Sequence, residues 1–370
     1  MTTTLPSPSE NRITILLPDL FKSFFAPEPP INQHYARAGH ESDRWICAWL
    51  NLDEQKAEHF RALDFNYNAA VWASEAPHDR FRLLCDWGAW IFVWDDLFDE
   101  EDGELSQDVE LARLAAKVLM ESMQSPFKAG GLEERFGEVS EKLSKTKTLI
   151  AAHQDFYTRF SACASLEHRE WYISSMRDFV GSEIAQVLSP SIDPNRSVAD
   201  ILESRRISIG VEPTFALNCF CHSIPRPPEH PAIERLGRIS KDFTLITNDL
   251  VSYRKEEAEA FTHNLVATLR LQNLSAQAAF DHIGVLLDDL HEELERTIAQ
   301  LPAGEDVQRY VKVCKDVPIG NLYWSFRTSR YFGALERREE VRRTRVLDVA
   351  EMPGYLGERG KGLRGNKGQR

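Results

Sequence analysis

The sequence has few of the alternating runs of β-branched and aromatic residues that mark strands. It contains no low-complexity linker and no repeat of fixed period, which excludes a solenoid and favours one continuous domain. The longest apolar stretch, from Trp87 to Trp94, is far too short to cross a bilayer. The amino-terminal residues lack a basic segment followed by an apolar one, so we expect no secretory signal and a cytoplasmic protein without a membrane span.

Cysteine spacing and net charge limit which metal sites and which partners the chain can have. The six cysteines show no paired spacing typical of a metal site, and we interpret them as reduced core thiols. The chain carries 57 acidic against 44 basic residues, a net charge of −13, so a nucleic acid or an anionic membrane surface would be repelled. An anionic small-molecule substrate would need a locally basic site.

Apolar residues recur instead at helical spacing along nearly the whole chain. Steps of three and four predict long core helices over 230–256 and 275–301. Similar patterns cover roughly 40–62, 79–101, 107–126, 132–163, 166–189, 197–223 and 305–335. We therefore predict an all-α fold, a single helical bundle over residues 13–340. Residues 1–12 are expected to be a disordered amino terminus, and residues 341–370 a basic, partly disordered extension.

An acidic cluster follows directly on the aromatic segment of the 79–101 helix. Asp95 and Asp99 lie one turn apart on one helical face, with Asp96 beside them. Carboxylates this close repel each other unless a cation neutralises them, and hard oxygen ligands suit Mg²⁺ or Mn²⁺. A solvated acidic helix end is the alternative, whereas an EF-hand is a poorer match to this spacing.

A second set of oxygen donors occurs late in the 230–256 helix. Asn248, Ser252 and Glu256 fall at i, i+4 and i+8, which stacks an amide, a hydroxyl and a carboxylate on one face. One carboxylate among three donors leaves room for waters and phosphate oxygens around Mg²⁺, although such a trio alone is also typical of an ordinary polar stripe.

Together the two motifs resemble those of the class I terpene synthases, which carry an aspartate-rich DDxxD/E motif and an NDxxSxxxE motif. The similarity is greatest to the fungal and bacterial sesquiterpene cyclases. This resemblance implies three Mg²⁺ ions, with Mn²⁺ as a substitute. Their ligands would be Asp95, Asp99, Asn248, Ser252 and Glu256.

The resemblance also implies a set of diphosphate-binding residues, some of them catalytic. Within Arg205-Arg206-Ile207-Ser208-Ile209-Gly210, Arg206 would be the diphosphate sensor and Gly210 the effector whose carbonyl faces the ionising carbon. Arg330 and Tyr331 match the terminal arginine–tyrosine pair, and Lys255 is a further donor. Such donors match phosphate oxygens and stabilise the charge of the leaving diphosphate.

A cyclase must shield a carbocation from water, so an apolar aromatic cavity is expected. Phe92, one turn before Asp95, and Trp324 are the main candidates to line it, with Phe215 and Asn218 as further ones. Core packing is the competing interpretation for these residues.

We therefore expect a lyase that ionises farnesyl diphosphate and cyclises the cation, acting as a monomer or homodimer. A diterpene cyclase that uses geranylgeranyl diphosphate is one alternative. A chain-elongating trans-prenyltransferase is another, for which Asp288-Asp289 superficially offers a second acidic motif. A non-enzymatic acidic helical scaffold is a third, and it predicts no magnesium-dependent binding of diphosphate.

Overall fold

A computed structural model describes residues 11–100, 102–128, 130–189, 195–259 and 261–356. Within these ranges the regular secondary structure is helical apart from one short two-stranded ribbon, which confirms the predicted all-α class. The helices, in chain order, are η1 (Ser23–Phe25), α1 (Tyr35–Trp49), α2 (Glu54–Ala62), α3 (Asn66–Trp72), α4 (His78–Asp99), α5 (Val109–Gln124), α6 (Gly131–Phe136), η2 (Gly137–Leu143), α7 (Ser144–Cys163), α8 (Leu166–Leu188), α9 (Val198–Ser208), α10 (Val211–His222), α11 (Pro231–Ala258), α12 (Leu265–Leu271), α13 (Ala276–Ile298), α14 (Glu305–Ser325), α15 (Ser329–Phe332) and α16 (Leu335–Thr344).

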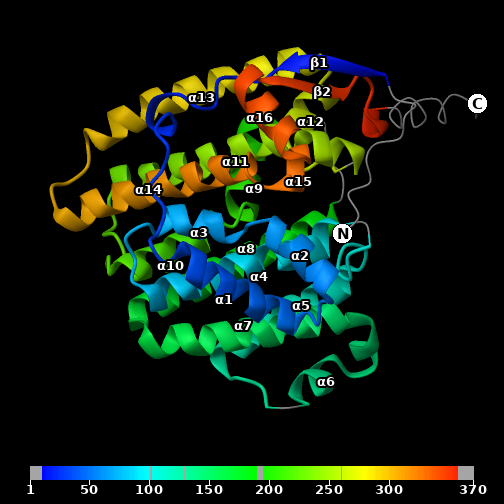
Figure 1. Ribbon diagram of the computed structural model, residues 1–370, viewed down its shortest axis with the longest axis vertical. Helices are drawn as coiled ribbons and strands as arrows, with labels where there is room; N and C mark the ends of the chain where they lie inside the picture. The colour runs from blue at the N-terminus through cyan, green and yellow to red at the C-terminus, as the bar shows by residue number, and fades with distance from the viewer. Residues whose placement is uncertain (1–10, 101, 129, 190–194, 260, 357–370) are drawn as a thin grey trace, which may run out of the picture.

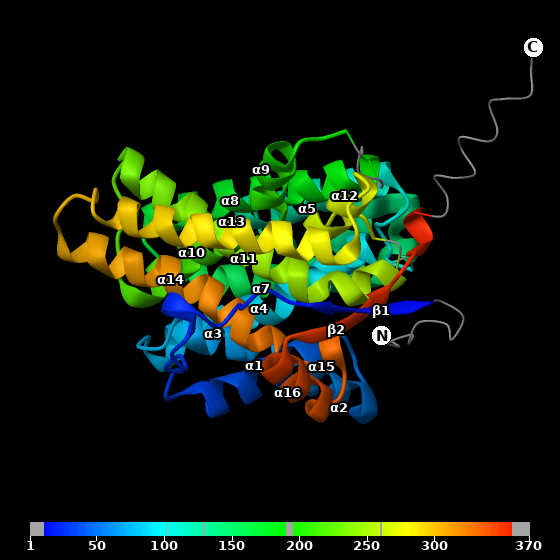
Figure 2. The ribbon, with the colours of Figure 1, turned by 90° about the horizontal axis from the view of Figure 1, so that it is seen from above.

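Two long helices organise the bundle. The helix α11 packs against α13 and α14, and α4 packs against α1 and α7, while α3 contacts both α4 and α14 (Figures 1 and 2). At the contact of α3 with α14, Gly320 allows an unusually close approach, since a Cβ there would lie 2.5 Å from Trp72 Nε1. The bundle thus holds α4 and α11, which carry the two predicted metal motifs, on opposite sides of a common interior.

The aromatic segment of α4 lies in the core of this bundle. Trp87, Trp90 and Trp94 are at most 1% exposed, and Trp90 Nε1 donates to the Leu149 carbonyl at 2.8 Å. An aromatic ring with a polar edge is stable in a core when that edge has a partner.

Among the described helices, none is both long enough and apolar enough to cross a membrane. Five of the cysteines are buried free thiols, and Cys163 is exposed.

The predicted helices differ from the observed ones mainly at internal breaks. The segment 40–62 divides at Asn51, which has φ 49°, and Asp53 then caps α2 by accepting a hydrogen bond from Lys56 N. Segment 132–163 divides into α6, η2 and α7, and the last predicted helix ends at Ser325. Segment 197–223 divides at Gly210, which has φ 69° between α9 and α10.

The ribbon was not expected from the sequence. Strand β1 (Arg12–Leu16) pairs antiparallel with β2 (Val346–Ala350), so that Arg12 lies opposite Ala350. The structure therefore differs from the expected extension at residues 341–350, which lie in α16 and β2. An isolated two-stranded ribbon is marginally stable, and this one is fixed to the bundle by a hydrogen bond from Ala350 N to Glu257 Oε1 at 3.0 Å. The expected disorder of residues 1–10 and 357–370 lies outside the described residues.

Candidate active site

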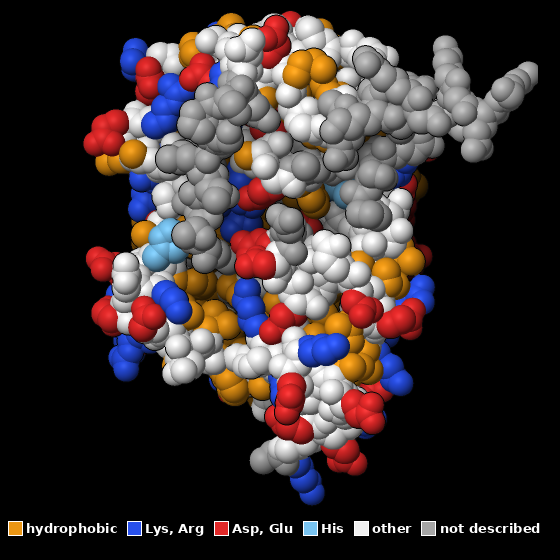
Figure 3. All heavy atoms as spheres, turned by 90° about the vertical axis from the view of Figure 1, so that its right-hand side faces the viewer, with side chains coloured by type: hydrophobic (Ala, Val, Ile, Leu, Met, Phe, Trp, Pro, Cys, Tyr) orange, Lys and Arg blue, Asp and Glu red, His pale blue; other side chains and the backbone are white. Residues whose placement is uncertain are grey.

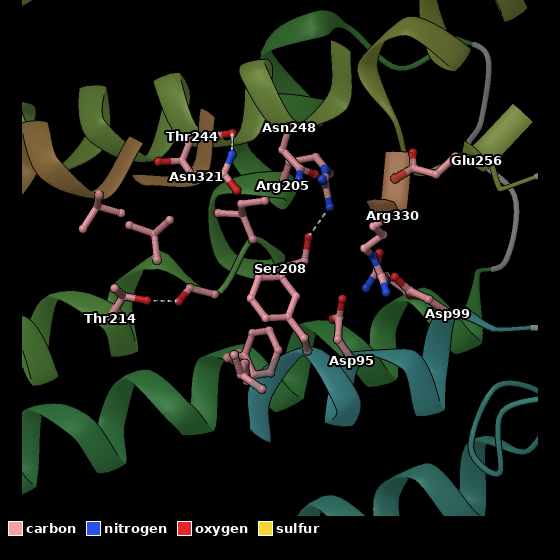
Figure 4. Close-up of a pocket in the computed structure, with 18 of the residues that line it drawn as sticks. Asp95, Asp99, Arg205, Ser208, Thr214, Thr244, Asn248, Glu256, Asn321 and Arg330 are labelled. Carbon is pink, nitrogen blue, oxygen red and sulfur yellow. Dashed lines mark hydrogen bonds between the residues drawn. The ribbon is translucent and has the colours of Figure 1, made fainter. Parts of the chain in front are cut away.

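One cavity in the bundle is polar at one end and apolar at the other (Figure 4). Helices α3, α4, α8, α11 and α14 form its walls, together with the α9–α10 junction and α15. The charged and polar lining residues include Asp95, Asp99, Arg205, Asn248, Lys255, Glu256, Arg330 and Tyr331, and the apolar ones include Trp72, Trp87, Ile91, Phe92, Phe179 and Val317. Acidic and basic side chains also gather near the middle of the face shown in Figure 3.

Asp95 and Asp99 occupy the last turns of α4 and both line the cavity (Figure 4). Burial and the neighbouring charge of Asp96 raise the pKa of Asp95 to about 7. Burial and Asp95 raise the pKa of Asp99 well above its usual range. Carboxylates that repel each other in a low-dielectric site become stable anions when a divalent cation binds them. Their arrangement therefore fits a metal-binding role.

Asp96 has a different environment from its neighbours. It is 1% exposed and accepts a hydrogen bond on Oδ1 from Arg330 Nη2 at 2.7 Å. This buried ion pair fixes Arg330 at the polar end of the cavity, and the Asp96 charge is the main attraction that raises the pKa of Arg330. Asp96 is thus a partner of the predicted diphosphate-binding arginine.

Two residues of the α11 trio, Asn248 and Glu256, line the same end of the cavity. Ser252 is 1% exposed and is not among the lining residues, and its hydroxyl lies beside the Glu256 carboxylate. Amide, hydroxyl and carboxylate oxygens on one helical face are the hard donors that Mg²⁺ prefers. Burial and the charge of Asp249 raise the pKa of Glu256 to about 7. These donors therefore suit Mg²⁺ better than a softer metal.

Tyr331 and Lys255 complete the polar end. Asn248 Nδ2 donates to Tyr331 Oη at 3.4 Å, and Lys255 Nζ forms an ion pair with Glu259 at 3.0 Å. In the part of the chain that the structure describes, no three His, Cys, Asp or Glu side chains converge to hold a metal alone. The two half-sites would therefore need waters or phosphate oxygens to complete a coordination shell.

Arg205, and not Arg206, is the arginine of α9 that lines the cavity. Arg205 Nη2 pairs with Asp249 Oδ1 at 2.6 Å. Its Nη1 donates to Ser208 Oγ at 3.1 Å (Figure 4). Arg206 instead binds both oxygens of Asp242, with Nε at 2.6 Å and Nη2 at 2.9 Å. The structure thus differs from the predicted sensor by one residue, because the orientation of α9 turns Arg206 towards Asp242.

Gly210 also differs from its expected role. It lines the cavity, but its carbonyl accepts a hydrogen bond from Thr214 Oγ1 at 3.0 Å (Figure 4). As the N-cap of α10, Gly210 has its carbonyl directed into that helix, so a hydrogen bond already occupies it. Its positive φ of 69° explains why glycine stands at this break.

The predicted aromatic lining is found in part. Phe92 lines the cavity, and the Trp324 ring lies behind it with centroids 4.8 Å apart. Trp324 is fully buried and donates through Nε1 to the Leu63 carbonyl at 2.9 Å. Phe215 and Asn218 are also fully buried and are not among the lining residues. These three side chains belong to the surrounding core.

Several residues of the site were not anticipated from the sequence. Trp72, Trp87 and Phe179 supply more of the apolar wall than the predicted residues. Glu183 on α8 is fully buried, and burial together with the charges of Asp95 and Asp99 raises its pKa well above the usual range. A glutamate one turn after Phe179 and facing inward was the available signal, but isolated helical glutamates are usually solvated.

Comparison with known proteins assigns the family. A family model described as terpene synthase family 2, C-terminal metal binding, matches residues 86–293. The chain is 32% identical to silphinene synthase of Penicillium patulum over 348 residues, which cover 92% of this chain and 91% of that protein. It is 27% identical to a sesquiterpene synthase of Cyclocybe aegerita over 353 residues, which cover 93% and 95%.

The fold is similar to that of solved structures. The crystal structure of linalool/nerolidol synthase from Streptomyces clavuligerus matches with a TM-score of 0.66 and 20% identity, over 81% of this chain and 98% of that one. The matched family segment contains both oxygen-donor motifs and implies binding of divalent metal. The chain therefore belongs to the class I terpene synthases, with the fungal sesquiterpene cyclases, and is a terpene cyclase.

Proposed function

We propose that this cyclase uses three Mg²⁺ ions to ionise farnesyl diphosphate and converts the resulting cation into a cyclic sesquiterpene hydrocarbon or alcohol. The observation that carries the proposal is the polar end of the cavity. There Asp95 and Asp99 of α4 share one opening with Asn248 and Glu256 of α11. The fifteen-carbon substrate is supported by the similarity to a fungal sesquiterpene synthase.

The metal ligands would be Asp95 and Asp99 on one side and Asn248, Ser252 and Glu256 on the other. Bound there, Mg²⁺ acts as a Lewis acid that neutralises the diphosphate oxygens. The structure contributes donors around the same opening, and each of them can bind phosphate oxygens: Arg205, Lys255, Arg330 and Tyr331. Arg205 takes the place that the sequence suggested for Arg206.

These donors stabilise the charge where it develops. When the bond between the allylic carbon and the diphosphate oxygen breaks, both electrons leave with the oxygen, and cationic donors lower the free energy of that anion. The allylic cation stays at the apolar end, among Trp72, Phe92 and Phe179, whose ring faces stabilise positive charge without acting as bases. A double bond of the same chain then attacks the cation, and proton loss or addition of water ends the reaction.

Two alternatives are less well supported. Asp288 and Asp289, the possible second acidic motif of an elongating enzyme, are exposed on α13, and Asp288 pairs there with Lys22. Neither lines the cavity. Geranylgeranyl diphosphate as the substrate, in place of farnesyl diphosphate, is distinguished by the number of carbons in the product.

The test is product analysis with each candidate substrate. Purified protein would be incubated with geranyl, farnesyl or geranylgeranyl diphosphate, with Mg²⁺ or with a chelator, and the organic extract analysed by gas chromatography and mass spectrometry. A magnesium-dependent cyclic C15 product is expected from farnesyl diphosphate. A C20 product alone would change the substrate, and a longer linear diphosphate formed with added isopentenyl diphosphate would overturn cyclisation.

A further inference from the structure

Asn264, the N-cap residue directly before α12, is fully buried beside the end of α11. Its Nδ2 donates to Glu256 Oε2 at 2.8 Å and to the Asp249 carbonyl at 2.8 Å. Its Oδ1 accepts from the backbone N of Val266 at 2.7 Å and of Ala267 at 3.3 Å. Exchanging the amide N and O would lose all four bonds, so the orientation of this side chain is fixed.

The two sides of the amide have different tasks. The oxygen caps α12, since it satisfies two backbone donors that have no partner inside that helix. The nitrogen reaches across to α11, where one of its hydrogens meets the Glu256 carboxylate. Capping needs only an acceptor, which a serine or an aspartate also provides. The donor directed at Glu256 is therefore a separate feature of asparagine at this position.

We propose that Asn264 is a positioning residue for the metal ligand Glu256. By holding Oε2, it orients the carboxylate and leaves Oε1 as the oxygen available to the cation. Partners that hydrogen-bond a metal ligand fix its orientation, and losing one typically lowers metal affinity by about 10- to 100-fold. This inference rests on the proposed function, because it takes Glu256 to be a metal ligand.

The start of α12 also helps to hold Arg205 in place. The backbone N of Leu265 donates to Asp249 Oδ2 at 2.7 Å, and Asp249 Oδ1 accepts from Arg205 Nη2 at 2.6 Å. The first turn of α12 thus contacts a metal ligand through Asn264 and a diphosphate-binding residue through Asp249. Asn264 and Asp249 are themselves fully buried, whereas their contacts with Glu256 and Arg205 are partly buried because both partners line the cavity.

The experiment separates capping from positioning with three variants. Asn264→Ser and Asn264→Asp keep a capping acceptor but lose the amide donor, and aspartate also places a second carboxylate beside Glu256. Asp108→Ser is the matched control. Asp108 Oδ1 caps α5 through the backbone N of Glu110 and Leu111, and Asp108 is absent from the cavity lining.

The first measurement is the melting temperature of each protein without ligand. Asn264→Ser should lie close to the wild type, and Asn264→Asp should lie below it, because its second carboxylate is placed beside Glu256 and the Asp249 carbonyl. The second is the Mg²⁺ concentration at half-maximal stabilisation by inorganic diphosphate. It should rise about 10- to 100-fold in both Asn264 variants and stay unchanged in Asp108→Ser. In turnover assays with farnesyl diphosphate, excess Mg²⁺ should restore much of the rate of Asn264→Ser.

An unchanged Mg²⁺ midpoint in both Asn264 variants would overturn the proposal while leaving the proposed function intact. Early melting of Asn264→Ser without ligand would assign Asn264 a structural role and would also overturn it. Early melting of Asn264→Asp alone, with a raised Mg²⁺ midpoint in both variants, supports the positioning role, because aspartate keeps the cap and adds only the repulsion from Glu256. A wild-type protein that diphosphate and Mg²⁺ fail to stabilise would instead reject the proposed function itself.

Discussion

The assignment of Arg205, in place of Arg206, to the diphosphate can be tested by exchanging each arginine for lysine. At position 205, lysine keeps the charge opposite Asp249 but loses the planar fork that reaches both Asp249 and Ser208. At position 206, lysine loses the paired contact with the two oxygens of Asp242. The two substitutions are chemically identical and occupy adjacent positions, so each is a control for the other.

The expected effects differ in kind. If Arg205 binds diphosphate, losing one hydrogen bond between charged groups should cost about 1.5–3 kcal/mol of transition-state stabilisation. That corresponds to a decrease in kcat/KM of about 10- to 150-fold. The charge near buried Asp249 is retained, so the melting temperature should change little. Arg206→Lys should lower the melting temperature and leave kcat/KM nearly unchanged.

The assay is release of diphosphate from farnesyl diphosphate at saturating Mg²⁺, with thermal unfolding of the same preparations. A larger loss of kcat/KM in Arg206→Lys than in Arg205→Lys would contradict the assignment of Arg205 and favour Arg206 as the diphosphate-binding residue. Equal and small losses in both variants would remove α9 from diphosphate binding altogether.

Three further predictions concern pH, the helix break and the metal. Because burial raises the pKa of Asp95 and of Glu256 to about 7, these groups are protonated in the folded metal-free protein at pH values where the unfolded chain has already lost the protons. The free energy of unfolding without metal should therefore fall as pH rises from 5 to 8. The stabilisation by Mg²⁺ with diphosphate should instead be larger at pH 8 than at pH 5. Denaturant titrations that show the opposite pH dependence would contradict this prediction. Gly210→Ala should lower the free energy of unfolding by about 1–2 kcal/mol, because alanine is strained at a φ of 69°. A steric clash is not the cause, since the added Cβ would lie at an ordinary 3.5 Å from Phe179. An unchanged melting temperature would count against this backbone strain. Chelation of divalent ions should abolish both turnover and the stabilisation by inorganic diphosphate, and turnover that persists in a chelator would reject the metal-dependent route.

Much of the helical framework could be predicted because its signal is local. A stripe of apolar residues at steps of three and four identifies a helix without knowledge of its partners, as for α11 and α13. The ribbon has no comparable signal. Each of its strands is only five residues long, and β1 and β2 lie at opposite ends of the described chain, so the pairing depends on the finished bundle.

The difference between local and tertiary signals also explains which site residues could be predicted from the sequence. Asp95 and Asp99 share a face because they are four residues apart on one helix, and the sequence alone fixes that relation. The choice between Arg205 and Arg206 depends on how α9 is rotated against α11, which is a tertiary property. Asn264 gives no local signal beyond a helix cap, since its contact with Glu256 exists only after α12 packs onto α11.

The register of α11 links the chemistry to the surrounding structure. Asn248 and Glu256 face the cavity. The next residue in each case contacts a neighbouring segment: Asp249 contacts Arg205, and Glu257 contacts the ribbon. Consecutive residues on a helix are separated by about 100° of rotation, so the two faces cannot shift independently. Asp249 holds Arg205, and Glu257 accepts hydrogen bonds from Ala350 N and Arg12 of the ribbon. The contacts of Asp249 and Glu257 therefore set the rotation of the helix that presents the proposed metal ligands.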